Sequence, residues 1–228
     1  MKHRANTMLD DTMLQIEALC FAYPECAVLS QWSAALPAGV LLLRGDESSG
    51  KTTLLRLIAG ELVAQSGRMS FGGGTLGGGP SPDGVFWADP RSVAADERTA
   101  RAWLDGLPAR YPQWDSAALG AHIDGFSLSE HLHKPFYALS TGSKRKVLMA
   151  GALASGAGLT LIDEPVAGLD KPSIAYLAHA LTQTATRARQ EGRVVLVAHY
   201  ETLPGVAWSR VIEIANPAHS PDNRAMPS

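Results

Sequence analysis

The segment GDESSGKT, from Gly45 to Thr52, constrains the fold of this chain more than any other stretch. It fits the pattern G-x-x-x-x-G-K-[ST] completely, and it lies between an apolar run at 39–45 and a segment at 52–62 with leucine and isoleucine on one helical face. A strand, a glycine turn and a helix in this order bring backbone N–H groups and a helix N-terminus to one point. The sequence therefore predicts a phosphate-binding loop, and a turn with an incidental lysine is the less favoured alternative.

The side chains of this loop match the chemistry of a nucleoside triphosphate with magnesium. Lys51 can reach the β- and γ-phosphates, and the Thr52 hydroxyl can ligate Mg²⁺. The acidic pair in the loop is expected to face water. The residues predicted to surround the phosphates are Gly45, Asp46, Glu47, Ser48, Ser49, Gly50, Lys51, Thr52 and Thr53.

A second acidic pair follows the apolar run LTLID at 159–163. If that run is a neighbouring parallel strand, its carboxyl end lies at the same sheet edge as the phosphate loop. Asp163 is then placed to hold Mg²⁺, and Glu164 to polarise an attacking water. Ordinary solvation of a loop is the alternative reading of the pair.

Apolar strands and helical segments alternate along the chain, which predicts an α/β fold with a mostly parallel sheet covered on both faces. A third strand is expected at 193–199, after a long polar helix at 173–190. The uncharged run 147–162 is too short to span a bilayer and contains glycines, so it is expected to be a buried helix that turns into a strand. The glycine-rich segment 71–84 is expected to be a flexible hairpin tip, and 89–138 to hold short helices.

The composition excludes several other classes of protein. The net charge of −2 gives no general attraction to nucleic acid, and two cysteines without partners at metal spacing indicate neither a zinc site nor a disulfide framework. Acidic residues near the N-terminus argue against a secretion signal. Residues 1–12 and 216–228 are expected to be flexible tails.

Three further segments follow the phosphate loop in order: LSTGSKRKV at 139–147, LIDEPVAGLD at 161–170 and VVLVAHY at 194–200. With them the sequence resembles the ATP-binding cassette of ABC proteins. The resemblance implies a P-loop NTPase fold with an antiparallel β portion and an inserted helical subdomain. It implies one domain over 13–215, with a core at 13–88 and 157–215 and the helical subdomain at about 89–156.

The resemblance also implies roles for five more residues. Tyr23 would stack on adenine, although a lone tyrosine is often a packing residue. Ser140 and Gly142 would face the ATP of an opposing subunit, and Asp170 would couple the two sites. His199 would contact the γ-phosphate, so that the catalytic set is Glu164, His199 and Lys51; a buried histidine without chemistry is the alternative.

The sequence departs from the family pattern in two places. Thr141 and Ser143 replace a glycine and a glutamine of the usual signature, while the hydroxyl and the bare backbone beside them are kept. Asp89 stands where the family has a glutamine, and it could still touch magnesium or its water. The expected metal ligands are therefore Thr52, Asp163 and Asp89.

The resulting hypothesis is the ATP-hydrolysing subunit of an ABC transporter, with ATP and Mg²⁺ as cofactors. The expected partners are a second cassette, as a homodimer, and an integral-membrane permease, which would place the chain at the cytoplasmic face of the plasma membrane. No nucleic acid is expected as a partner. A soluble ABC ATPase acting on nucleic acid or ribosomes is the alternative, and a P-loop kinase would leave the signature unexplained.

Overall fold

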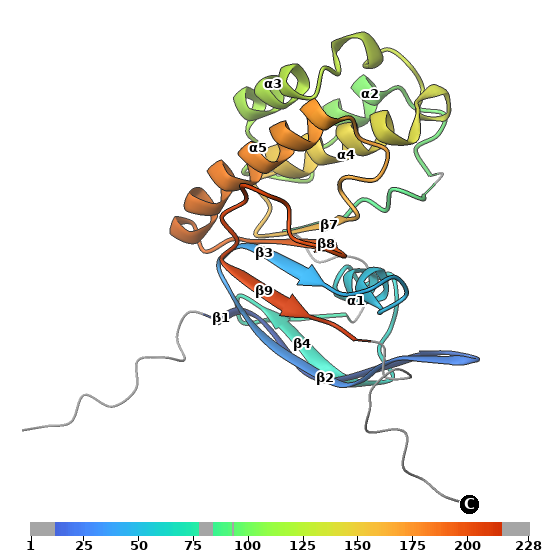
Figure 1. Ribbon diagram of the computed structural model, residues 1–228, viewed down its shortest axis with the longest axis vertical. Coiled ribbons are helices and arrows are strands. Elements are labelled where there is room, and N and C mark those ends of the chain that lie inside the picture. The colour runs from blue at the N-terminus through green and yellow to red at the C-terminus, as the bar shows by residue number, and fades with distance from the viewer. Residues whose placement is uncertain (1–11, 78–83, 93, 216–228) are drawn as a thin grey trace, which may run out of the picture.

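The computed structural model describes residues 12–77, 84–92 and 94–215 of the chain. Its strands form two sheets, and a group of helices covers one of them (Figure 1). The α/β fold with a parallel sheet, an antiparallel sheet and a helical portion is the one that the sequence predicts. The tails predicted at 1–12 and 216–228 lie, apart from Thr12, outside the described residues.

The larger sheet has five parallel strands, and it carries the phosphate loop. Its order is β6 (Val85–Phe86), β7 (Leu159–Asp163), β8 (Val194–His199), β3 (Gly39–Arg44) and β9 (Arg210–Glu213). The three central strands are apolar nearly throughout because both faces of the sheet are covered.

Side chains that alternate along these strands divide the apolar interior into two cores. In β3, Leu41 and Leu43 belong to one core, and Val40 belongs to the other. In β8, Leu196 belongs to the core that contains Leu41 and Leu43, and Val197 belongs to the core that contains Val40. This alternation follows from the two-residue period of a strand, and it anchors different layers on the two faces.

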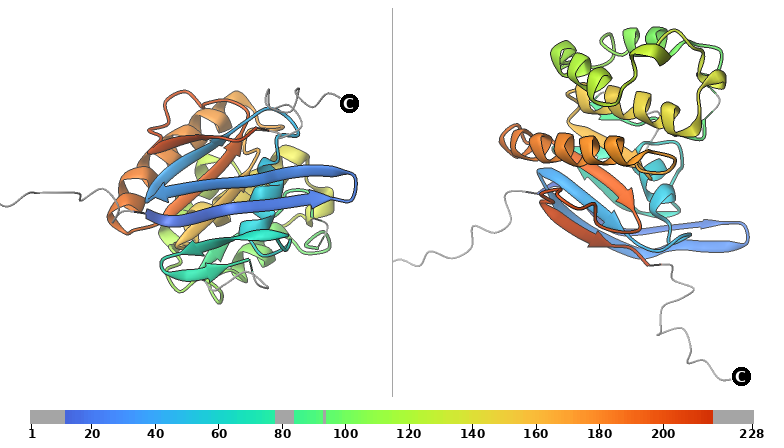
Figure 2. Two further views of the ribbon diagram at one scale, coloured as in Figure 1. Left: turned by 90° about the horizontal axis from the view of Figure 1, so that it is seen from below. Right: turned by 45° about the horizontal axis from the view of Figure 1, so that its top comes forward.

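The smaller sheet is antiparallel, with the order β2 (Cys26–Pro37), β1 (Thr12–Tyr23), β4 (Ser66–Phe71) and β5 (Gly74–Leu76). Helix α1 (Lys51–Ile58) packs between the two sheets, with its apolar side chains in a core shared by both (Figure 2). The hairpin between β4 and β5 turns at Gly72 and Gly73. The rest of the predicted glycine-rich tip, 78–83, lies outside the described residues.

Helices cover the other face of the parallel sheet (Figures 1 and 2). They are α2 (Ala100–Asp105), α3 (Ser116–Gly125), two 3₁₀ turns (Ser129–His131 and Phe136–Ala138), α4 (Thr141–Ala154) and α5 (Lys171–Gln190). Each α-helix in this group begins after a side chain that accepts a hydrogen bond from the first turn, namely Thr99, Asp115, Ser140 and Asp170. Short polar residues in the sequence thus fix where these helices start.

Helix α1 is shorter than the apolar pattern at 52–62 predicts. It ends at Ile58 because Gly60 adopts a left-handed conformation, φ 77°. The N–H of Glu61 then donates to the carbonyl of Arg56, and that of Gly60 to Leu57, which closes the helix end. Leu62 consequently lies beyond the helix.

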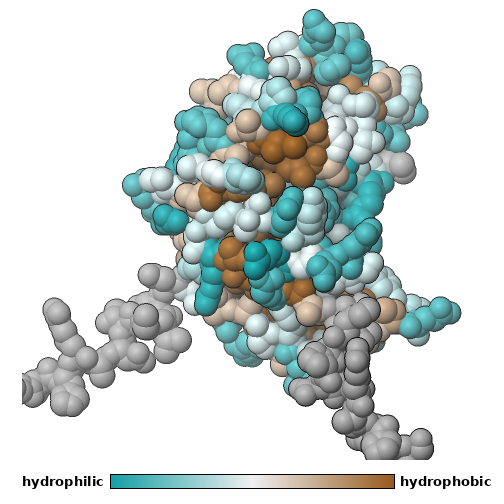
Figure 3. All heavy atoms as spheres, in the orientation of Figure 1, coloured by the Kyte–Doolittle hydropathy of each residue, from teal (hydrophilic) through white to brown (hydrophobic). Residues whose placement is uncertain are grey.

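The face of the molecule drawn in Figure 3 is largely hydrophilic, and hydrophobic residues gather in a patch over the helical part. Among the described residues, no helix is both long enough and apolar enough to cross a membrane. The run 147–162 is divided between α4 and β7, as expected of a buried helix that turns into a strand.

Candidate functional site

Three neighbouring strands of the parallel sheet end at one open hollow. In the register of the sheet, Arg44 of β3 lies beside His199 of β8, and Ala198 lies beside Asp163 of β7. The phosphate loop leaves β3 at this edge, so residues far apart in sequence meet there. The hollow has a volume of about 820 Å³ and is lined by Tyr23, Cys26, Val28, Asp46, Glu47, Ser48, Ser49, Gly50, Lys51, Thr52, Thr53, Arg91, Arg145, Asp163, Glu164 and Tyr200.

Two glycines allow the phosphate loop to turn as tightly as it does. A Cβ on Gly45 would lie 2.3 Å from the carbonyl oxygen of Ile214. Gly50 has φ 98°, and a Cβ there would lie 2.8 Å from Cγ1 of Val28. Both positions therefore exclude a side chain, and the glycines of the sequence pattern have a steric reason in this fold.

Lys51 reaches back over its own loop from the first turn of α1. Its ammonium donates hydrogen bonds to the carbonyl oxygens of Gly45 (2.7 Å) and Asp46 (2.8 Å), and it lies 3.7 Å from Oε1 of Glu164. Only 6% of its side chain is exposed. A buried cation held by neutral carbonyls can exchange these partners for the oxygens of a phosphate, which are stronger acceptors.

Thr52 and Asp163 bring two hard oxygen donors together. The Thr52 hydroxyl donates to Oδ2 of Asp163 at 2.8 Å, and Oδ1 of the same carboxylate is buried without a hydrogen-bond partner in the described part of the chain. This pair fits magnesium, which commonly takes one or two protein oxygens and completes its shell with phosphate and water. No group of three or more His, Cys, Asp or Glu side chains within 12–77, 84–92 and 94–215 is arranged to hold a metal without such help.

Glu164 follows Asp163 in a left-handed conformation, φ 45°. Its Oε2 lies 2.8 Å from Nδ1 of His199, which is almost fully buried. Burial by itself raises the pKa of Glu164, but the hydrogen bond with His199 and the charges of His199 and Lys51 outweigh it, so the pKa lies below its usual value. Glu164 is therefore a carboxylate at neutral pH, as a residue that orients water must be.

The aromatic residue expected to stack on adenine lines the same hollow. Tyr23 is the last residue of β1, is 40% exposed, and contacts Phe21 edge to face at 5.0 Å. Cys26 and Val28 of β2 line the hollow beside it. The ring is thus accessible to a base whose phosphates lie on the loop.

The other residues assigned by resemblance lie outside this hollow. Ser140 caps α4 by accepting a hydrogen bond from the N–H of Ser143 (3.1 Å), and Asp170 caps α5 by accepting one from Ser173 (2.8 Å). Gly142 is buried, and a Cβ on it would lie 2.1 Å from the carbonyl oxygen of Gly168. In this chain, close packing of its own backbone already requires the glycine of the signature.

Each residue of the basic triplet 144–146 in α4 has a partner within the chain. Lys144 lies 3.1 Å from Asp96, and Lys146 lies 2.8 Å from Asp170. Arg145 donates from Nε to the carbonyl oxygen of Glu164 at 3.1 Å. Arg145 and Lys146 therefore tie α4 to the segment that follows β7, and Lys144 ties it to the loop after β6.

Asp89 holds Arg91 in this structure. It does not line the hollow, and its Oδ1 accepts a hydrogen bond from the backbone N–H of Arg91 at 2.8 Å. The guanidinium of Arg91, not the carboxylate of Asp89, contacts Thr52 and Asp163. The turn at Pro90 brings Arg91 to the site, and contact between Asp89 and magnesium stays a prediction.

Arg91 and Arg145 are the functional candidates that sequence reasoning missed. Arg91 stands two residues past Asp89, the position compared with the family glutamine, and Arg145 is the middle residue of the basic triplet at 144–146. The available signal for Arg91 is its place two residues after Asp89, which the comparison with the family puts near magnesium. For Arg145 the helical pattern alone carried no such signal.

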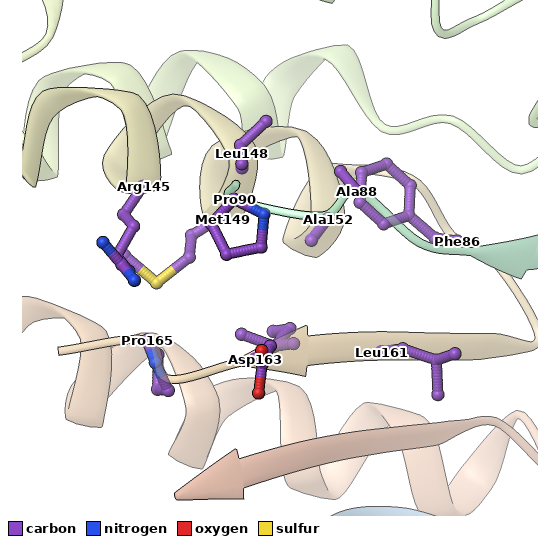
Figure 4. Close-up of a pocket in the computed structure, with 11 residues that line it drawn as sticks. Phe86, Ala88, Pro90, Arg145, Leu148, Met149, Ala152, Leu161, Asp163 and Pro165 are labelled. Atoms are coloured by element: carbon purple, nitrogen blue, oxygen red, sulfur yellow. The ribbon is translucent and has the colours of Figure 1, made fainter. Parts of the chain in front are cut away.

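A small cavity lies between α4 and β7, beneath the site (Figure 4). Its volume is about 20 Å³, close to that of one water molecule. The lining is apolar except for Arg145 and Asp163, and the apolar part includes Phe86, Met149 and Leu161. This surrounding keeps bulk water away from the inner side of Asp163, whose pKa is raised by burial against the lowering effects of Thr52 and Arg91.

Comparison with known proteins agrees with this geometry. The sequence profile of the ABC transporter family matches residues 29–167. A cytochrome c biogenesis ATP-binding export protein CcmA of Sphingopyxis alaskensis is 30% identical over 189 residues, which cover 82% of this chain and 90% of that protein. The protein of the same name from Rhodospirillum rubrum is 33% identical over 177 residues, covering 74% and 72%.

Solved structures share the fold. A structure of the ATP-binding subunit of an ABC transporter superposes with a TM-score of 0.73 at 23% identity and covers 90% of this chain and 87% of its own. A putative ABC transporter ATP-binding protein from Pyrococcus furiosus has a TM-score of 0.68 at 20% identity, covering 89% and 98%. At these identities the likeness concerns the fold alone.

Proposed function

This chain belongs to the ABC transporter family as an ATP-binding and ATP-hydrolysing subunit, and we propose that it drives a separate membrane permease by closing, as a pair of cassettes, around two ATP molecules. The observation that carries the proposal is the convergence of the phosphate loop, Asp163 and Glu164 on one hollow at the ends of β3, β7 and β8. A P-loop kinase would need a second substrate site there instead of the Glu164–His199 pair.

ATP binding uses groups that are already in place. The phosphate loop and the N-terminus of α1 supply N–H donors, and Lys51 exchanges the carbonyls of Gly45 and Asp46 for the β- and γ-phosphates. Tyr23 supplies an aromatic face for the adenine. Thr52 and Asp163 would hold Mg²⁺, which offsets phosphate charge when it is bound.

Hydrolysis depends on Glu164 as the residue that orients the attacking water. Its hydrogen bond with His199 fixes the direction of the carboxylate, and its low pKa keeps it ionised. His199 is almost fully buried and contacts Glu164 through Nδ1, and we propose that within this chain it acts on the water through that carboxylate. Lys51, 3.7 Å from Glu164, is also placed to stabilise negative charge on the transferring phosphoryl group.

In a pair of cassettes, the signature residues of one copy would contact the ATP that is bound by the other copy. Ser140 and Asp170 lie outside the chain's own hollow, and the capped N-terminus of α4 is a positively polarised end that suits a phosphate. A head-to-tail pair of identical chains would bring this end to the ATP held by the other copy, with the same contacts made twice. Loss of the γ-phosphate would then loosen the pair.

A second hollow supports docking of a permease on the helical side of the molecule. It has a volume of about 280 Å³, and its walls join the loop after β6 to α2 and α4. Aromatic side chains in the wall and charged ones around it are typical of a protein interface with apolar anchors. The contributing side chains include Trp87, Trp103, Tyr111, Phe136, Arg98 and Lys144.

We propose export as the direction of transport and the cytoplasmic face of the membrane as the location of the chain. The relatives named above are ATP-binding export proteins, which supports the first statement. The location at the cytoplasmic face follows because ATP must be supplied to a subunit that is docked on a permease. The alternative, a soluble ABC ATPase acting on nucleic acid or ribosomes, has no positive observation in its favour.

Affinity purification of the tagged chain from gently solubilised membranes tests the proposal. We expect a reproducible integral-membrane partner, and we expect ATP to turn the Glu164→Gln variant from monomer to dimer on a sizing column. Co-purifying nucleic acid without a membrane partner would instead favour the soluble alternative. A Lys51→Ala variant, which should not bind ATP tightly, is the control for both measurements.

A further inference from the structure

A guanidinium already contacts the two residues proposed to hold magnesium. Nη2 of Arg91 donates to Oδ2 of Asp163 at 2.5 Å and to Oγ1 of Thr52 at 3.1 Å. The same Oδ2 accepts the hydrogen bond from the Thr52 hydroxyl. One positive group thus lies against both oxygens of the pair, as a bound cation would.

The loop after β6 holds Arg91 in contact with Thr52 and Asp163. Oδ1 of Asp89 accepts a hydrogen bond from the N–H of Arg91 and lies 3.5 Å from its Nε. The Arg91 side chain is 60% exposed, whereas the Asp163 side chain is fully buried. The guanidinium can therefore leave into solvent, but the carboxylate cannot move away from the site.

We propose that Arg91 serves as the cation of the Thr52–Asp163 pair in the nucleotide-free protein, and that magnesium arriving with ATP displaces it. This inference rests on the proposed role of that pair in binding magnesium. Asp89, by this account, is a positioning residue that holds Arg91 on the pair. It also gives the Asp89-Pro90-Arg91 sequence a function in place of the family glutamine.

Arg91 then affects ATP binding in opposite directions with and without magnesium. Without the metal, the guanidinium offsets the charge of Asp163 beside the phosphates and can itself pair with a phosphate oxygen, so it favours binding. With the metal, the contacts between Arg91 and the pair must be broken first, so it opposes binding. Both effects reduce the dependence of ATP affinity on Mg²⁺.

The test uses calorimetry on the whole chain to measure two dissociation constants for ATP. The quantity compared is the constant in EDTA divided by the constant in saturating Mg²⁺. We expect Arg91→Ala to raise this ratio on the order of ten-fold over the unsubstituted protein, the size expected when a charged hydrogen bond is removed. Arg91→Lys, which keeps the charge but loses the fork of donors, should give an intermediate ratio. Asp89→Asn should shift the ratio in the same direction by a smaller factor.

Arg68→Ala is the matched control, because Arg68 also pairs with a carboxylate, that of Glu17, but lies on β4 outside the hollow. It should leave the ratio unchanged. A ratio in Arg91→Ala that equals or falls below that of the unsubstituted protein, with ATP still bound in both conditions, would overturn the inference alone. Absence of ATP binding by the unsubstituted protein would overturn the proposed function and the inference together.

Discussion

Oε2 of Glu164 and Nδ1 of His199 lie 2.8 Å apart, although the two residues are 35 positions apart in the sequence. The contact joins the end of β7 to the end of β8, and His199 is 1% exposed while the Glu164 side chain is 31% exposed. A buried imidazole that holds a partly exposed carboxylate fixes its direction toward the nucleotide hollow. The two residues are therefore expected to act as one unit.

The first prediction concerns that unit. Glu164→Gln and His199→Ala should each lower the ATP turnover number by roughly 100-fold or more, because a positioned general base contributes at least this much. The double variant should be no slower than Glu164→Gln alone, since His199 acts through the carboxylate. Turnover under saturating ATP, measured on all four proteins, gives the result. Multiplication of the two single effects would show instead that His199 acts on the phosphate independently of Glu164.

The second prediction uses the packing of α4 against the turn after β7. Gly142→Ala should lower the free energy of unfolding by about 1–3 kcal/mol, the usual cost of overpacking, because the new methyl would lie 2.1 Å from the carbonyl of Gly168. Gly120→Ala in α3 is the matched control, because a Cβ there would meet nothing within 4 Å beyond its own helix backbone and chain neighbours, and it should be neutral or stabilising by up to about 1 kcal/mol. Urea unfolding compares the two. Equal stabilities would mean that the Gly168 carbonyl moves aside at little cost.

The sequence predicts the three central strands of the parallel sheet and the phosphate loop well because their signals are local. Each of the central strands is a short apolar run, and the loop pattern names its own glycines and lysine. The boundary of α1 was missed because the apolar residues continue past Gly60, whose left-handed conformation ends the helix. A single glycine in a helical pattern does not reveal which conformation it will adopt.

The missed part of the site depends on contacts between distant segments. The pairing of Arg91 with Asp163 spans 72 positions, and that of Arg145 with the Glu164 carbonyl spans 19. Both arginines look like surface charges until the fold brings β6, β7 and α4 together. Gly142 shows the same limit, since its steric requirement comes from Gly168 and cannot be read from the signature itself.

The third prediction concerns pH and a buried histidine of the helical part. His122 hydrogen-bonds the Tyr176 hydroxyl at 2.9 Å, and burial lowers its pKa below the usual value, against a smaller opposing effect of Asp115. The unfolded chain therefore takes up the proton first as the pH falls, so the free energy of unfolding decreases below about pH 6.5. The contribution of His122 is fully present above its unfolded pKa and is lost as the pH falls through the folded one.

Replacing His122 with a residue that does not titrate removes its contribution to the pH dependence of the free energy of unfolding. We expect the unsubstituted protein to lose more stability than His122→Gln between about pH 7.5 and 5.5, because glutamine keeps a polar contact but does not titrate. Urea unfolding at the two pH values measures the difference, and titrations shared by both proteins cancel. His133→Gln, at an exposed position, is the control and should behave like the unsubstituted protein. A His122→Gln variant with an unchanged pH slope would show that His122 is as easily protonated in the folded state as in the unfolded chain.

The fourth prediction tests the adenine end of the nucleotide hollow with the chain's own two cysteines. Cys26 is exposed and lines the hollow beside Tyr23, whereas Cys20 on β1 does not line it. ATP with Mg²⁺ should slow alkylation of Cys26 by a small maleimide at least several-fold, because the base would cover the thiol, and it should leave the rate at Cys20 unchanged. Peptide mass spectrometry follows both sites in one sample, so Cys20 serves as the internal control. Equal protection of both cysteines would indicate a general tightening of the fold, and protection of neither would place the adenine away from Tyr23.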